Sequence, residues 1–186
     1  MKKIFCALFI LTSFLGFSQE DIPEAEFVGE AFVIQPDNSI VKLKKETVKI
    51  RTRTGVSVYL TGVGKTKTKI STDGCCSEVV IKPKDEIKIV VKAANNDNDP
   101  ISAIQIFKLT QKKNKRVAEL ASFGTFSGND NNKLDYLKFN GEKYGENSYL
   151  LTIKEFERGA EYGIMLAVTN VYVQTSNTVI STFAVE

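Results

Sequence analysis

Apolar and polar residues alternate along most of this chain, which is the pattern of β-strands with one buried face. Over residues 48–60 the even positions hold Val, Ile, Thr and Leu, whereas the odd positions begin with Lys49, Arg51 and Arg53. Gly55 offers a turn at which this run can break. Residues 87–92 alternate in much the same way, so the pattern predicts strands in both segments.

Turn-forming clusters separate further segments of this kind, and residues 111–116 have the composition of a hairpin tip. We expect these further strands at residues 27–34, 101–109, 117–123, 148–153, 162–169 and 179–185. No window shows a long amphipathic helix. About eight to ten short strands predict an all-β fold, an antiparallel β-sandwich of immunoglobulin-like or similar Greek-key topology. Residues 129–147 fit either a long loop packed onto the sandwich or a smaller second lobe.

The start of the chain has the three parts of an export signal. Met1-Lys2-Lys3 is basic, residues 4–17 are apolar and uncharged, and Gly16-Phe17-Ser18 places small residues two positions apart. The apolar run is shorter than the roughly 20 residues of a membrane-spanning helix. We therefore expect a signal peptide over 1–18, a single β-sandwich domain over 19–186, and a periplasmic or cell-surface protein with no transmembrane span after signal removal.

Removal of the signal changes the charge and shows where it is concentrated. Loss of Lys2 and Lys3 lowers the formal net charge from +3 to +1, yet residues 42–69 carry nine basic side chains and one acid, Glu46. Period-two geometry places Lys49, Arg51 and Arg53 on one face of a strand. It likewise places three further cations on one face of the next strand: Lys65, Lys67 and Lys69.

If the two strands pair through the glycine turn at residues 62–64, the two rows form one cationic surface. Such a surface attracts polyanions such as acidic polysaccharide, lipopolysaccharide phosphates or nucleic acid outside the cell. The alternative is a solubilising outer face whose lysines guard a sheet edge against aggregation.

Cys75 and Cys76 are the two cysteines that remain after signal removal, and they are adjacent. They do not form the disulfide framework of a small secreted scaffold, so a hydrophobic core must hold the fold. Three interpretations stay open: one buried and one exposed thiol beside a turn, a vicinal disulfide in an oxidising compartment, or a soft-metal pair.

Oxygen-bearing side chains stand at alternate positions in Asn95, Asp97 and Asp99, the spacing of calcium-binding loops. Pro100 stands where such a loop requires Gly, and the twelfth position is Ile106 instead of Glu. A second oxygen-rich stretch, residues 129–132, would complete a site only if the fold brought the two together. Asn and Asp are also ordinary turn residues.

The chain has no histidine, which excludes Ser-His and Cys-His nucleophile systems and the usual zinc sites. Residues 62–66 end like a phosphate-binding loop, but Tyr59 replaces its first glycine. Ser39 and Lys42 match S-x-x-K in a turn and strand, where they face opposite sides. Carboxylate pairs for glycoside chemistry remain formally possible at Glu155 with Glu157 or Glu161. We expect no enzyme and no cofactor.

Three segments carry a resemblance to known proteins. They are residues 59–65 (YLTGVGK), residues 118–128 (AELASFGTFSG), and residues 143–145 with 148–151 (KYG and SYLL). These segments resemble small exported β-proteins of Bacteroidota-type bacteria, and Gln19 as first mature residue is similar to their processing pattern. The resemblance covers most of the mature chain and implies a periplasmic or surface β-protein. It carries over no functional residue.

The sequence is compatible with two functions. The first is an exported noncatalytic cell-envelope module that contacts an anionic glycan, another polyanion or an envelope protein through the basic face, with no intracellular nucleic acid as partner. The second is a carbohydrate-binding or glycan-hydrolysing accessory domain. The absence of tryptophan counts against it, since stacking would rest on Tyr59, Tyr136, Tyr144 and Tyr172. The sequence leaves the oligomeric state open.

Overall fold

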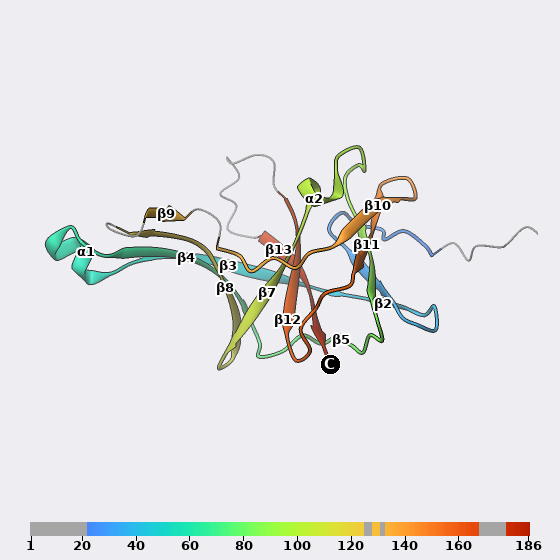
Figure 1. The fold of residues 1–186 in the computed structure, drawn as a ribbon, viewed down its shortest axis with the longest axis horizontal. Helices are drawn as coiled ribbons and strands as arrows, with labels where there is room; N and C mark the ends of the chain where they lie inside the picture. The colour runs from blue at the N-terminus through green and yellow to red at the C-terminus, as the bar shows by residue number, and fades with distance from the viewer. Residues whose placement is uncertain (1–21, 125–127, 131–132, 168–177) are drawn as a thin grey trace, which may run out of the picture.

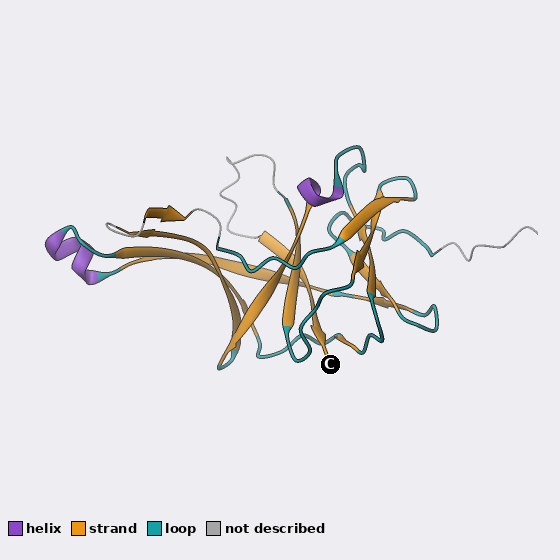
Figure 2. Cartoon of the chain, in the orientation of Figure 1, coloured by secondary structure: helices purple, strands orange, loops and turns teal. Residues whose placement is uncertain are grey.

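The computed structural model describes residues 22–124, 128–130, 133–167 and 178–186. This part of the chain is built almost wholly of strands, arranged in two sheets that pack together, with two short helices (Figures 1 and 2). The all-β sandwich predicted from the alternating pattern is therefore confirmed, whereas the immunoglobulin-like topology stays a prediction. The expected signal peptide lies outside the described residues.

The smaller sheet has five antiparallel strands in the order β10-β11-β6-β1-β2. Their bounds are Asn140–Tyr144, Ser148–Ile153, Ile87–Lys92, Ala31–Ile34 and Ile40–Lys42, respectively. β6 is the central strand, in which Ile87, Ile89 and Val91 are buried on one face and Val90 on the other, whereas Lys88 is exposed.

The larger sheet has eight strands, in the order β12-β7-β8-β4-β3-β13-β5, with β9 paired to β8. The bounds in chain order are β3 Lys44–Thr54, β4 Lys65–Asp73, β5 Val80–Ile81, β7 Ile104–Lys112, β8 Lys115–Gly124, β9 Gly128–Asp130, β12 Glu161–Leu166 and β13 Thr178–Val185. β12 also pairs with β13, so the strands from β12 round to β13 form a closed circuit.

Three strands of the larger sheet run on beyond the sandwich and form a projecting arm (Figure 1). We define the arm as residues 49–71 together with residues 118–124. β3 changes partner where the arm begins: Val48 pairs with Thr178 of β13, whereas Lys49 pairs with Ser71 of β4. The helix α1 (Val56–Thr61) forms the far end of the arm.

Two hydrophobic clusters stabilise the described part of the chain. The larger one lies between the two sheets and includes Val33, Ile89 and Leu151 from one sheet and Ile106 and Phe183 from the other. The smaller one lies inside the closed circuit at the base of the arm and consists of Val48, Ile70, Phe107, Leu109, Ala118, Leu134 and Ile180. Beyond this base most side chains of β3 are exposed on both faces, so the arm is stabilised mainly by its ladder of backbone hydrogen bonds.

Several predicted boundaries were wrong. The strand expected over 48–60 ends at Thr54, and α1 follows it. The strand expected at 27–34 begins at Ala31. The strand expected at 101–109 begins later, because residues 100–103 form α2 (Pro100–Ala103), which Asp99 caps through a hydrogen bond from the Ile101 N–H at 2.8 Å.

Residues 133–139 pack onto the sandwich as a loop, because Leu134 enters the smaller cluster and backbone hydrogen bonds join Asp135 and Leu137 to β7.

No helix within the described ranges has the length and apolar character of a membrane-spanning segment.

Candidate functional site

The two cationic rows predicted from the sequence lie side by side on one face of the arm. In the antiparallel pairing of β3 with β4, Arg51 is opposite Lys69 and Arg53 is opposite Lys67. Directly paired residues of neighbouring strands share a face, so four cations gather within two rungs of the ladder. The strands are joined through α1 as well as the glycines that follow it, and not by a glycine turn alone.

The cationic face lines a groove of about 520 Å³. Lys65 extends it toward the tip of the arm, and the hairpin between β7 and β8 adds Lys112 and Lys115, which sequence reasoning did not include. Among the residues that the structure describes, seven basic side chains and no acidic one line the groove: Arg51, Arg53, Lys65, Lys67, Lys69, Lys112 and Lys115. We call this set the basic groove. Lys49 does not line it.

Acidic side chains beside the groove neutralise part of this charge. Lys49 binds Asp73 at 2.6 Å, and Glu119 accepts from Lys67 at 3.1 Å and lies 3.7 Å from Lys69. By contrast, within the described part of the chain Arg51, Arg53 and Lys65 have no carboxylate at ion-pairing distance. Lys112 and Lys115 of the hairpin likewise have no such partner among the described residues, so these five cations of the groove are the ones most available to an external anion.

The pKa values of the neighbouring acids reflect the positive field of the groove. The hydrogen bond from Lys49 and the charges of Lys49, Arg51 and Lys115 hold the pKa of Asp73 below its usual value. Burial raises the pKa of Glu119, but the hydrogen bond from Lys67 and the charges of Lys67 and Lys69 outweigh it and leave that pKa lowered. The groove thus favours the ionised form of any acid that lies against it.

A buried ionic cluster supports the base of the groove, next to Lys115. Arg116 is 1% exposed, and its guanidinium donates to Glu46 at 2.6 Å, to Ser77 Oγ at 2.8 Å and to the Gly74 carbonyl at 3.3 Å. The same guanidinium lies 3.5 Å from Glu161, which in turn accepts from the Ser77 backbone N–H. Glu46 also accepts hydrogen bonds from Thr72 and Thr182.

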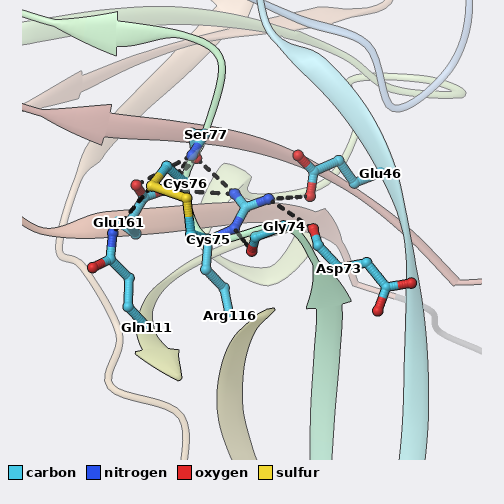
Figure 3. The surroundings of a disulfide bond; sticks show 9 residues. All are labelled: Glu46, Asp73, Gly74, Cys75, Cys76, Ser77, Gln111, Arg116 and Glu161. Atoms are coloured by element: carbon cyan, nitrogen blue, oxygen red, sulfur yellow. Dashed lines mark hydrogen bonds and ion pairs between the residues drawn. A yellow bond between two sulfur atoms is a disulfide. The ribbon is translucent and has the colours of Figure 1, made fainter. Parts of the chain in front are cut away.

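The turn that carries Cys75 and Cys76 closes over this guanidinium, and a disulfide joins the two residues (Figure 3). Figure 3 shows Arg116 pointing into the turn, with Glu46 and Glu161 on opposite sides of it. Of the three interpretations that the sequence left open, the arrangement corresponds to the vicinal disulfide. The Gln111 side-chain amide lies 3.8 Å from the Cys76 sulfur.

Thiol labelling tests the state of this pair in the isolated protein. We expect residues 19–186, purified without reductant, to take up no iodoacetamide under denaturing conditions, and two equivalents after reduction, because the disulfide occupies both sulfurs. Intact-mass spectrometry measures both values. Two equivalents before reduction would show that Cys75 and Cys76 are free thiols.

The three residues considered for calcium take part in local turns. Asn95 accepts from the Asp97 N–H, Asp97 lies 3.6 Å from Lys143, and Asp99 caps α2. The second oxygen-rich stretch, residues 129–132, begins in β9 of the eight-stranded sheet. Its residues 131–132 lie outside the described residues. Among the described residues no three His, Cys, Asp or Glu side chains gather as a metal site. Calcium binding at Asn95, Asp97 and Asp99 therefore stays a prediction, and the described residues do not supply the second group of ligands that it requires.

The motif-like stretches are used structurally. Gly62 ends α1 with φ +70°, a conformation that favours glycine, and residues 65–66 begin a strand where a phosphate-binding loop would begin a helix. Ser39 binds Asp37 in a turn, while Lys42 pairs with Glu30 at 2.6 Å. Glu161 belongs to the buried Arg116 cluster, away from Glu155 and Glu157, which line another hollow.

No protein-family model and no curated protein sequence matches the chain. What the fold and the site define is a class: a β-sandwich with a projecting, positively charged arm.

Proposed function

We propose that the protein is an exported, noncatalytic module of the cell envelope that binds polyanions in the basic groove of its arm. The observation that carries this proposal is the lining of the groove, in which seven cations and no acid surround a space of about 520 Å³. Cations from two strands and one hairpin converge there, although the mature chain as a whole is nearly neutral.

The cross-strand pairing adds a physical argument. Like charges directly opposite each other destabilise an antiparallel pair, and Arg51–Lys69 and Arg53–Lys67 are two such pairs, separated only by the Thr52–Thr68 pair. A solubilising surface does not require this arrangement, since lysines alternating with acids would serve as well. A bound polyanion would relieve the repulsion, so binding and stabilisation of the arm are coupled.

Charge reversal at Arg51 and Arg53 separates binding from folding. We expect Arg51→Glu with Arg53→Glu to abolish retention on heparin at low salt, because about 1 kcal/mol per cation corresponds to at least ~30-fold weaker binding for two reversed charges. The double variant should fold at least as stably as wild type, since each new acid faces a lysine across the ladder, a pair worth about 0.2–1 kcal/mol. Heparin elution and urea unfolding measure the two effects.

Lys82→Glu with Lys84→Glu is the matched control, because it makes the same change in net charge at exposed positions outside the groove. This control should elute from heparin close to wild type. Equal losses in both double variants would show that net charge alone governs retention. Wild-type protein that is not retained at all would overturn the proposal.

One observation favours the second candidate, a carbohydrate-binding function. Asp135, Glu155 and Glu157 line a hollow of about 390 Å³ together with Tyr136 and Phe156. Carboxylates beside aromatic rings suit sugar hydroxyls and ring faces, although Glu157 is already bound by Lys108. Glu155→Gln should lower the affinity for a neutral oligosaccharide found by glycan-array screening and leave heparin retention unchanged. If Glu155→Gln leaves that affinity unchanged, this hollow is not the sugar site.

A further inference from the structure

The tip of the arm exposes apolar side chains that contribute nothing to either hydrophobic cluster. Val56 is 72% exposed, Tyr59 77%, Leu60 79% and Val63 40%, and none of the residues of α1 is buried. Burial of apolar surface is the main force that folds a protein. Side chains as exposed as these add little to the stability of the fold. An apolar patch with a polar rim marks a site of interaction with a membrane or a protein.

Three of the four side chains share one helical face. Val56, Tyr59 and Leu60 stand at positions i, i+3 and i+4 of α1 and form a single apolar stripe, whereas Val63 follows the helix, beyond Gly62 with its φ of +70°. The tip is also preformed: the Gly55 N–H donates to the Lys65 carbonyl at 3.1 Å, and the Gly62 N–H donates to the Val58 carbonyl at 3.0 Å. Little ordering remains to be done when this stripe meets an apolar phase.

The cations that follow the tip along the arm indicate which apolar phase the tip contacts. Arg51, Arg53 and Lys65 lie on the arm together with α1, and, like Lys112 and Lys115 of the same groove, they have no carboxylate at ion-pairing distance in the described chain. A second copy of the chain would bring like charges together. A bilayer with anionic headgroups instead offers phosphates outside and acyl chains within, in the same order as the cations and the apolar tip.

We propose that the tip of the arm inserts into the interfacial region of an anionic lipid bilayer. Val56, Tyr59, Leu60 and Val63 enter the acyl boundary, and Arg51, Arg53 and Lys65 bind headgroup phosphates. Tyr59 suits this boundary, because its ring is apolar and its hydroxyl is polar. This inference rests on the proposed function, since the same groove supplies the charge.

Sedimentation with vesicles tests the proposal. Wild type should bind vesicles of phosphatidylglycerol and phosphatidylcholine and should not bind pure phosphatidylcholine. The variant with Tyr59→Gln, Leu60→Gln and Val63→Gln, none of which lines the basic groove, should bind the anionic vesicles ~100-fold or more weakly, because each large apolar side chain contributes roughly tenfold or more when buried. The same variant should keep wild-type retention on heparin and wild-type stability, since these side chains are exposed.

Insertion has a direct signal, because the chain contains no tryptophan. The single tryptophan of Tyr59→Trp should shift its emission to the blue on anionic vesicles and be quenched by brominated lipid. Phe27→Trp, at an exposed position outside the arm, is the matched control and should remain unquenched.

The outcomes separate this inference from the proposed function. Retention on heparin without vesicle binding overturns the membrane inference and leaves polyanion binding in place. Vesicle binding that the tip variant retains, or equal quenching of the two tryptophans, also overturns insertion of the tip. A tip variant that loses a pulled-down protein partner while wild type ignores vesicles assigns the tip to a protein instead. A wild type that binds neither heparin nor vesicles overturns both proposals.

Discussion

Replacing Arg116 with Met is expected to lower the free energy of unfolding by about 3–5 kcal/mol, the usual effect of removing one partner from a buried ion pair. Arg116 is 1% exposed and donates to Glu46, Ser77 and the Gly74 carbonyl. In its absence Glu46 remains largely buried without its cation. Urea unfolding at neutral pH, followed by circular dichroism, measures the loss.

The pH dependence of this loss identifies its cause. Burial raises the pKa of Glu46, but the hydrogen bonds from Arg116 and Thr72 outweigh it, so the pKa is lowered in the native protein. Without Arg116 the burial effect dominates and Glu46 takes up a proton more readily. The gap in stability between Arg116→Met and wild type should therefore shrink as the pH falls from neutral toward the ordinary pKa of a carboxyl group.

Arg53→Met is the matched control, because it makes the same chemical change at an exposed position of the arm, and it should change stability by about 0.5 kcal/mol or less. If Arg116→Met were as stable as this control, the cluster beneath the disulfide turn would have no structural role.

The strands of this fold could be predicted to the extent that their side chains alternate. β11 was expected at its observed bounds, because Ser148–Ile153 is an uninterrupted run between turn residues. α1 was missed because six residues are too few to separate two periods: Val56, Val58 and Leu60 fit a strand as well as Val56, Tyr59 and Leu60 fit a helix. The hydrogen bond from the Gly62 N–H to the Val58 carbonyl belongs to the helix, and the spacing of apolar residues along the sequence does not reveal it.

The candidate site was predictable in part for the same reason. Period two places Arg51 with Arg53, and Lys67 with Lys69, on one face each, whatever the rest of the fold. Lys112 and Lys115 join them only because β8 lies against β4. Arg116 could not be singled out at all, since it ends a basic run typical of an exposed hairpin tip. Its burial follows from the positions of Glu46 and Glu161, which are far from it in sequence.

Glu24 fastens the start of the described chain to the five-stranded sheet. Its carboxylate binds Lys92 of β6, the Ser148 hydroxyl at 2.8 Å and the backbone N–H groups of Glu146 and Asn147. It lies so close over Gly145 that a Cβ there would stand 1.8 Å from Glu24 Oε1, and φ at Gly145 is +55°. The turn between β10 and β11 is thus shaped around this carboxylate.

Glu24→Gln should destabilise the protein at pH 7 and have little effect at pH 2, where about half of the Glu24 carboxylate is protonated. The hydrogen bond from Lys92, aided by those from Ser148, Glu146 and Asn147, outweighs burial and lowers the pKa of Glu24 from 4.5 to about 2. A lowered native pKa stabilises the fold fully above the unfolded value and loses that effect as the pH falls through the native value. With the side chain about one-fifth exposed, the expected loss at pH 7 is about 2 kcal/mol.

The measurement is the free energy of unfolding of both proteins at several pH values between 7 and 2. The two curves should run parallel above about pH 5 and converge below it, because protonated Glu24 resembles Gln in charge. Glu142→Gln, an exposed carboxyl change on the neighbouring strand β10, should follow the wild-type curve throughout. A constant gap between Glu24→Gln and wild type down to pH 2 would show that shape and hydrogen-bond geometry, and not the ionised carboxylate, hold the chain start to the sheet.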